Sequence, residues 1–430
     1  MLDIKFIREN PEKVKEGCKK KNVEVDIGKI LELDKRKREL QQQIESLRAR
    51  HSDTSTQIGV VLRNTQGPGP VSAGLEIISR GKDEKKEIEK IEKQIEEIEG
   101  GVKSLLVQLP NLPFDDVPVG DESKNVVLRQ WGKIPKFAFE PKDHLELGEA
   151  LDIIDVKRAA KVSGARFGYL KGDAALLEFA LVELAMKTAT KKGFTPIIPP
   201  VFVRSEIMQG MGYVDTPEDL AERYFFEKDG LFLVGTGEQS VGPMYADEIF
   251  EESELPKRYV AFSTCFREEA GSYGKDTRGI LRVHQFDKVE LFSFVKPEDS
   301  RKEHEFLIAF EEKLWQALKI PYQVVHLATG DMSRPSASTY DIEAWMPGQK
   351  KYREVSSASN VTDFQARRLN IRYRTKEGKP EFVHMLNATG FPIGRTIIAI
   401  LENYQQKDGS VKIPGALQGY MGKEKIERPA

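Results

Sequence analysis

The chain has 430 residues and a mass of 48.7 kDa, which predicts two or three folding units rather than one core. Its 66 Lys and Arg residues nearly balance 68 Asp and Glu residues, so the whole chain has no net attraction to nucleic acid or anionic lipid. With only Cys18 and Cys265, a disulfide framework and a cysteine-based zinc or iron–sulfur site are excluded. The sequence has neither a signal-peptide-like stretch nor a run of about 20 apolar residues, so we expect a cytosolic protein without membrane contact.

Residues 1–108 are predicted to form a helical unit. Apolar residues recur three and four positions apart over residues 30–61 and again over residues 88–105, which places them along one stripe of each helix. The sequence Gly-Pro-Gly-Pro at 67–70 cannot continue a helix and predicts a turn. The two helices are therefore expected to pair as an antiparallel coiled-coil hairpin.

Two features of the sequence bear on the stability and the role of this hairpin. Gly74 and Gly81 interrupt the returning apolar stripe, so fraying is expected over residues 71–83. Residues 1–100 contain 21 Lys and Arg against 20 Asp and Glu, so composition alone favours an oligomerisation coiled coil over a basic arm.

Residues 109–430 are predicted to form a second domain after a linker marked by Pro110, Pro113 and Pro118. Long strands mixed with helices predict an α+β fold. No Gly-rich dinucleotide fingerprint or GxxxxGK[ST] loop occurs, so a nucleotide would be held by another device. Helices are expected at 147–161, 174–192 and 299–318, and strands at 195–203, 231–234, 259–266, 288–295, 322–327 and 340–345.

Two segments combine arginine with a position suited to phosphate. Arg267 ends a predicted strand before a polar loop at 272–279, and the planar guanidinium of an arginine matches two phosphate oxygens. Arg395 lies in the first turn of an apolar helix that follows a Gly-rich turn, where the helix dipole also favours an anion. Each segment taken alone is more often a solvated surface hairpin or an exposed arginine at a helix start.

A third segment, residues 353–360, carries Glu354 and several hydroxyls on a predicted strand. These oxygens are ligands that Mg²⁺ accepts, although an edge strand would show the same pattern. The six histidines have no metal-ligand spacing, so zinc is not expected, and His284 is interpreted as a hydrogen-bonded structural residue.

Together these segments resemble the motifs of class II aminoacyl-tRNA synthetases, and over its full length the chain is similar to the seryl-tRNA synthetases. The resemblance implies an α+β fold, with an antiparallel class II sheet flanked by helices after an N-terminal coiled-coil hairpin. The segments that carry it are 266–269 with 282–290 (motif 2), 394–395 (motif 3), 193–200 (the dimer-forming motif 1), 139–150, 158–167 and 361–374.

The resemblance implies a serine–tRNA ligase, which activates L-serine with ATP to seryl-adenylate and transfers it to the 3′ end of serine tRNA. Charging of selenocysteine tRNA is left open. Arg267 would hold the α-phosphate and Arg395 the γ-phosphate as the catalytic pair. The implied ATP contacts also include Glu268, Glu269 at the adenine amino group, Val283, Phe286 stacked on adenine, Glu354, Val355, Ser356 and Ser357. Glu354 and Ser357 would bind Mg²⁺.

The implied serine site contains Thr236, Gly237, Glu238, Arg267, Glu290, Asn387 and Thr389. The sequence departs here from the family's usual pattern. We expect Thr-Ala-Glu where residues 236–238 read Thr-Gly-Glu, and Asn-Gly-Ser-Gly where residues 387–390 read Asn-Ala-Thr-Gly. Ser338 stands where the family commonly has Lys.

The resemblance also reassigns the hairpin at 1–108 as a tRNA-binding arm that reaches the tRNA bound at the partner's active site in a homodimer. A nearly neutral arm remains compatible with this role because RNA helices are recognised mostly by shape and backbone. Two alternatives are a paralogue that loads a carrier other than tRNA and an inactive RNA-binding paralogue. The retained hairpin argues against the first, and the retained Arg267, Glu269, Glu354 and Arg395 argue against the second.

Overall fold

The computed structural model describes residues 1–64, 71–270 and 278–428. The chain separates into two compact units. One consists of Leu2–Lys19 and Val23–Leu109, and the other of Met1, Lys20–Asn22 and Pro110–Ala430. The turn expected at 67–70 lies outside the described residues.

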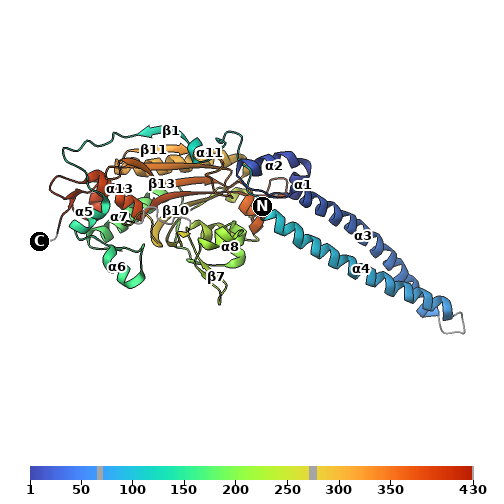
Figure 1. Cartoon of the computed structure of the whole chain (residues 1–430). Helices are drawn as coiled ribbons and strands as arrows, with labels where there is room; N and C mark the ends of the chain where they lie inside the picture. Colours follow the sequence, from blue (N-terminus) through green and yellow to red (C-terminus); the bar gives the residue numbers. More distant parts are fainter. Residues whose placement is uncertain (65–70, 271–277, 429–430) are drawn as a thin grey trace. The chain divides into compact units, whose positions relative to one another are not determined.

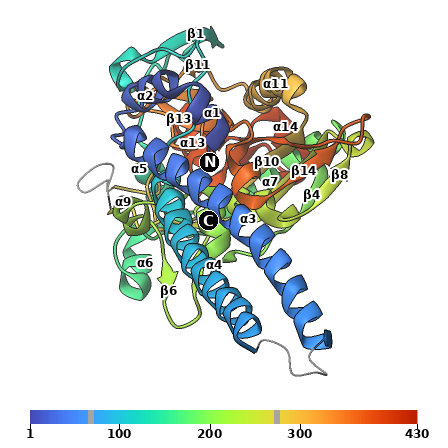
Figure 2. The same ribbon diagram turned by 90° about the vertical axis from the view of Figure 1, so that its right-hand side faces the viewer.

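The first unit is helical, and its long helices α3 (Ile27–Asn64) and α4 (Val71–Leu106) lie side by side as an antiparallel hairpin in both views (Figures 1 and 2). Leu40, Ile44 and Ile91 form its buried seam, so the predicted coiled-coil hairpin is confirmed. Two short helices precede it, α1 (Ile4–Glu9) and α2 (Pro11–Lys20).

The expected fraying of the returning helix is not found, because α4 is continuous from Val71. A Cβ at Gly74 would lie 3.1 Å from the Val61 side chain, and one at Gly81 would lie 3.1 Å from that of Ile58. Both glycines therefore face the partner helix, and they allow close packing where a larger residue would push the helices apart.

The second unit contains an eight-stranded sheet, and among the described residues its pairings are antiparallel except that of β4 with β9. The α+β prediction is thus confirmed. The strand order is β1 (Val126–Trp131), β11 (Tyr322–His326), β12 (Ser338–Met346), β13 (Lys351–Asn360), β16 (His384–Pro392), β10 (Gln285–Val295), β9 (Lys257–Phe266) and β4 (Thr195–Ile197). Smaller sheets contain β5 (Phe202–Arg204), β7 (Leu231–Leu233) and β6 (Phe225–Phe226); β15 (Pro380–Phe382), β14 (Arg372–Arg374) and β8 (Ile249–Glu251); β2 (Ile154–Asp155) and β3 (Tyr169–Leu170); and β17 (Val411–Lys412) and β18 (Lys425–Ile426).

The helices of this unit pack on the sheet and bury its main core, with α11 holding Leu307, Leu314 and Trp315 against β13 and β16. Their bounds are α5 (His144–Ala150), α6 (Val156–Ser163), α7 (Asp173–Thr190), α8 (Ser205–Met211), α9 (Pro217–Ala221), α10 (Glu238–Val241), α11 (Ser300–Leu318), α12 (Phe364–Leu369), α13 (Ile393–Tyr404) and α14 (Gly415–Met421).

Two predicted elements were wrong in extent. The single helix expected at 147–161 is α5 and α6 with β2 between them, because residues 154–155 pair with β3. The strand expected at 195–203 is β4 and β5, and Pro199-Pro200 between them cannot donate to a ladder.

A buried lysine anchors one loop of the second unit. Lys21 donates hydrogen bonds from Nζ to the carbonyls of Ser333 at 2.8 Å, Arg334 at 3.2 Å and Ser336 at 2.5 Å. Three carbonyl dipoles that converge on one point repel one another unless a cation or donor lies between them, so Lys21 fixes this loop. Burial, with a smaller contribution from Arg334, lowers the pKa of Lys21 to about 7.

This lowered pKa predicts a pH-dependent stability. Between pH 7 and pH 10 the unfolded chain binds the Lys21 proton and the folded chain does not, so the contribution of Lys21 to the free energy of unfolding rises with pH. From pH 7 to pH 9 the difference in unfolding free energy between wild type and Lys21→Met should grow by about 2 kcal/mol, measured by urea denaturation. A difference that is constant or shrinks over this range would contradict the burial of an ammonium there.

Candidate active site

A cavity of about 610 Å³ opens on the second unit, and it brings the sequence-predicted segments together. Arg267, from the end of β9, and Arg395, from the first turn of α13, both line it. So do Thr236, Glu238, Glu269, Val283, Phe286, Glu290, Glu354, Val355, Ser356, Ser357, Asn387 and Thr389. Of the predicted residues, Gly237 and Glu268 are not in this lining.

The cavity arises where the central sheet parts. Strands β13 and β16 pair over only three residue pairs, of which the last is Ala358 with Ala388. Beyond it Ser356 and Ser357 on one strand and Thr389 on the other all face the cavity. The cavity also extends over Ser359 and Asn387, which pair within the ladder, so it is lined on both sides of the point where the ladder ends.

One side of the cavity is cationic. Arg395 Nη1 donates to the Glu354 carbonyl at 2.9 Å and pairs with Glu354 Oε1 at 3.1 Å. Arg267 Nε donates to the Gly235 carbonyl at 3.1 Å, and its guanidinium lies 5.3 Å from the centre of the Phe286 ring. Arg395 above all, followed by Arg267, lowers the pKa of Glu354 against the effect of burial. Both arginines therefore line one cavity, where Arg395 pairs directly with Glu354.

The other side holds two buried carboxyl groups, Glu238 and Glu290. The Tyr213 hydroxyl donates to Glu238, Thr236 Oγ1 donates to Glu290 Oε2 at 3.1 Å, and Lys288 pairs with Glu290. Burial, followed by repulsion from Glu290, raises the pKa of Glu238 to about 7, and burial also raises the pKa of Glu290. This side thus presents acceptors and negative charge suited to an ammonium group.

Sequence reasoning missed several lining residues. Lys288 lies two positions before Glu290 on β10, and Asp341 and Glu343 lie two positions apart on β12. Residues two apart on a strand point to the same face of the sheet, so this spacing could have identified all three. Tyr213 and Arg223 are brought in by tertiary packing, and no local pattern in the sequence marks them.

The family departures have different structural contexts. A Cβ at Gly237 would lie 3.2 Å from Ser263 Oγ and 3.5 Å from Glu290 Cβ, so the glycine makes room for this buried serine. Ser338 is buried, contacts His326 Nε2 at 3.2 Å through Oγ, and is not in the lining of the large cavity. Its difference from the family's Lys therefore does not alter the cavity wall.

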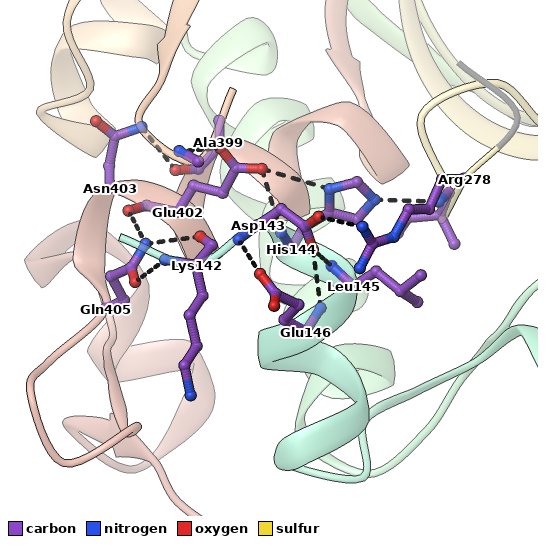
Figure 3. A network of polar contacts seen from close by, with 12 residues as sticks. Lys142, Asp143, His144, Leu145, Glu146, Arg278, Ala399, Glu402, Asn403 and Gln405 are labelled. Atoms are coloured by element: carbon purple, nitrogen blue, oxygen red, sulfur yellow. Dashed lines mark hydrogen bonds and ion pairs between the residues drawn. The ribbon is translucent and has the colours of Figure 1, made fainter. Parts of the chain in front are cut away.

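A polar network connects α13 to the segment around His144 (Figure 3). The fully buried Glu402 of α13 accepts from the backbone N–H of His144 at 3.2 Å and of Gly348 at 2.9 Å. His144 Nε2 accepts from the Ile280 N–H at 3.3 Å, so Nδ1 carries the ring proton, 3.4 Å from Glu402 Oε1. The network links the helix that bears Arg395 to Ile280, which lines the cavity.

Most of the polar loop predicted at 272–279, residues 272–277, lies outside the described residues. Its described end contains Arg278, which lies 3.4 Å from Asp143 (Figure 3). His284 Nδ1 lies 3.0 Å from the Arg267 carbonyl, as expected of a hydrogen-bonded structural residue.

Comparisons with known proteins agree with this geometry. A model of the tRNA synthetase class II core domain (G, H, P, S and T) matches residues 224–404, and the seryl-tRNA synthetase N-terminal domain matches residues 1–113. The serine–tRNA ligase of Thermodesulfovibrio yellowstonii is 45% identical over 424 residues, which cover 98% of this chain and 99% of that protein. The chain belongs to the seryl-tRNA synthetase family. The Dictyoglomus turgidum serine–tRNA ligase is likewise 45% identical, over 99% of both chains.

Solved structures of the family match over the same length. The Pyrococcus horikoshii seryl-tRNA synthetase complexed with ATP has a TM-score of 0.92 at 42% identity, with 100% of both chains covered. The cytoplasmic serine–tRNA ligase of Naegleria fowleri in complex with AMP has a TM-score of 0.88 at 31% identity, covering 100% of this chain and 99% of that one.

The described residues contain neither a candidate membrane-spanning helix nor a preformed cluster of metal ligands. Within residues 1–64, 71–270 and 278–428, no helix combines the length and the apolar character needed to cross a bilayer. Over the same ranges, no three His, Cys, Asp or Glu side chains are grouped closely enough to hold a metal ion by themselves.

Proposed function

We propose that the chain is a serine–tRNA ligase that forms seryl-adenylate from L-serine and ATP and transfers the seryl group to the 3′ end of serine tRNA. The observation that carries this proposal is that Arg267 and Arg395 line the same cavity as the buried pair Glu238 and Glu290. One side is suited to a triphosphate and the other to an amino acid's ammonium and hydroxyl groups. Nothing favours the carrier-loading or inactive alternatives.

The proposed reaction needs no side-chain nucleophile. The serine carboxylate attacks the α-phosphorus of ATP, a new P–O bond forms, and pyrophosphate leaves. In the second step the 3′-terminal adenosine hydroxyl attacks the seryl carbonyl, and AMP leaves. Arg267 orients the α-phosphate and Arg395 the γ-phosphate, so the protein supplies positioning and neutralises charge that builds up at phosphorus. Phe286 offers a ring face to adenine, and Glu269 an acceptor for its amino group.

Serine recognition is assigned to the buried polar side of the cavity. Glu238 and Glu290 bind the ammonium and hydroxyl groups, and Thr236, Asn387 and Thr389 complete the pocket. A pocket of buried polar groups rejects an analogue without the hydroxyl because those groups would then lack partners, whereas one methylene is worth only about 1–3 kcal/mol.

The residues present fit a magnesium ion bound together with the nucleotide. Glu354 and Ser357 offer hard oxygen donors in the cavity, and Asp341, which pairs with Ser357 across the sheet, has a buried Oδ1 without a partner in the described part of the chain. Glu354 and Ser357 would hold the ion, with phosphate oxygens as further ligands. When bound, Mg²⁺ neutralises phosphate charge and so offsets the repulsion between ATP and these carboxylates.

The adenylation step is tested by serine-dependent exchange of pyrophosphate into ATP. Wild type should exchange with serine alone among the twenty amino acids, and Arg395→Ala should lower the exchange rate at least 100-fold, because the γ-phosphate loses its cation. Arg374→Ala, on β14 outside the cavity lining, is the matched control and should exchange at the wild-type rate. Wild-type exchange in Arg395→Ala would refute the γ-phosphate assignment, and no exchange in wild type would refute the proposed function.

The hairpin α3–α4 is proposed to bind tRNA through shape and backbone contacts, which need reach and a few placed cations rather than net positive charge. A hairpin without residues 41–95, closed by a short turn, keeps the Lys37–Glu99 ion pair at 2.9 Å and also keeps Met1 and Lys21. We expect serine-dependent exchange to be unchanged and tRNA charging (kcat/KM for tRNA) to fall more than tenfold. Undiminished charging by this variant would contradict a tRNA-binding arm.

A homodimer through the motif 1 region is also proposed. Strand β4 is an edge of the large sheet, and Leu176 and Phe179 of α7 and Ile198 after β4 are 53%, 65% and 79% exposed. Large apolar side chains gathered along an open edge favour a protein partner. Phe179→Glu should give a monomer in sedimentation velocity experiments. Val162→Glu changes an equally exposed residue of α6 and should leave a dimer; a dimer in both variants would contradict this interface.

A further inference from the structure

The amide of Thr389 lies where the hydrogen bonding of the sheet is interrupted on both sides. The ladder between β16 and β13 ends at Ala388, and the ladder between β16 and β10 has a bulge between Val289 and Glu290, the residue opposite Thr389. A buried backbone N–H without a partner costs about as much as a lost hydrogen bond. This N–H needs an acceptor from outside the sheet.

Helix α11 supplies that acceptor. The Thr389 N–H donates to Oε1 of Glu311 at 2.9 Å, and Glu311 is fully buried. One helical turn further along α11, Trp315 Nε1 donates to Ser356 Oγ on β13 at 3.0 Å. Residues four apart share one helix face, so Glu311 and Trp315 bond to the two strands on either side of the gap.

We propose that Glu311 is a positioning residue for serine specificity, which holds the backbone at Thr389 so that the Thr389 side chain stays at the serine pocket. This inference rests on the proposed function, because it assigns Thr389 to serine. Glu311 is not in the cavity lining, and it acts only through the backbone it holds. In a pocket for so small a substrate, a shift of one wall changes the hydrogen bonds to the hydroxyl.

The surroundings of Glu311 favour its neutral form. Burial raises the pKa of Glu311 well above its usual range, and the neighbouring Asp341 and Glu290 raise it further, although the Thr389 N–H and Lys288 oppose the shift. Its other oxygen, Oε2, is buried without a hydrogen-bond partner in the described part of the chain. A neutral amide of the same length can therefore replace the acid, whereas a shorter carboxyl group cannot reach Thr389.

The test compares Glu311→Gln with Glu311→Asp in the full chain. Gln keeps the reach and an acceptor oxygen, and Asp keeps the carboxyl group but is one methylene shorter. In serine-dependent pyrophosphate exchange, Glu311→Asp should raise KM for serine about three- to tenfold, the worth of one neutral hydrogen bond, and leave KM for ATP within twofold. Glu311→Gln should keep both constants within twofold of wild type.

Trp315→Phe removes the matching bond on the other side of the gap and should leave KM for serine unchanged. Amide hydrogen exchange followed by mass spectrometry gives a readout independent of activity: the peptide containing Thr389 should exchange faster in Glu311→Asp and at the wild-type rate in Glu311→Gln. Equal changes in KM for serine and for ATP, or a wild-type KM for serine in a folded Glu311→Asp protein, would overturn the inference. If wild type showed no serine-dependent pyrophosphate exchange, the proposed function would be refuted instead. The rate of amide hydrogen exchange at Thr389 would still decide whether Glu311 holds this backbone.

Discussion

Two neighbouring strands of an antiparallel sheet satisfy each other's backbone groups only where they are hydrogen-bonded to one another. In this protein the ladder between β13 and β16 stops after three residue pairs, and residues on both sides of that point line the cavity. Every backbone donor released by the parting of the strands must find another partner in the buried interior. The site therefore depends on groups beneath the sheet as well as on the residues that face the ligand.

Helix α11 meets this requirement at the Thr389 N–H through Glu311, and it carries further polar side chains that are unusual in a core. Besides Glu311 and Trp315, His304 contacts the Ala358 carbonyl at 2.9 Å, and Glu303 accepts from Ser293 and Arg258. A helix face of leucines would have buried more apolar area but left the Thr389 N–H and these side-chain donors unpaired. The helix thus acts as a scaffold for hydrogen bonds as well as a hydrophobic layer.

The cavity also balances charge before any ligand binds. Arg395 pairs with Glu354, Lys288 with Glu290, and Arg282 with Glu269, so each of these carboxylates has a cation beside it. Buried charges without partners would cost far more than these pairs. In the proposed reaction a triphosphate would replace these carboxylates as the partner of the arginines, so the guanidinium groups would already be desolvated and held in place when it binds.

The sequence predicted those features that depend on the spacing of neighbouring residues. The 3–4 spacing marked the hairpin, and the arginines at the strand end and the helix start marked the cationic side of the cavity. The full-length resemblance then connected these segments, which lie more than 100 residues apart. The hydrogen bond from the Thr389 N–H to Glu311 could not be predicted from the sequence. Helix α11 contains several acidic residues, and the sequence does not show which of them packing will bury. The same holds for Lys21, one of three successive lysines, of which packing buries this one in a cage of carbonyls.

That lysine also shows that the N-terminal sequence is needed to complete the unit that holds the cavity. Met1 donates from its α-amino group to the Phe364 carbonyl, and Lys20–Asn22 belong to the same compact unit as residues 110–430. Removing everything before the linker would therefore delete the hairpin and also leave the carbonyls of Ser333, Arg334 and Ser336 without their donor. Ser333 lines the cavity, so such a truncation would disturb the site directly. A loss of tRNA charging after that truncation could come from the missing hairpin or from the disturbed cavity. Deleting only residues 41–95 shortens the hairpin, keeps Lys21 in place, and so tests the hairpin alone.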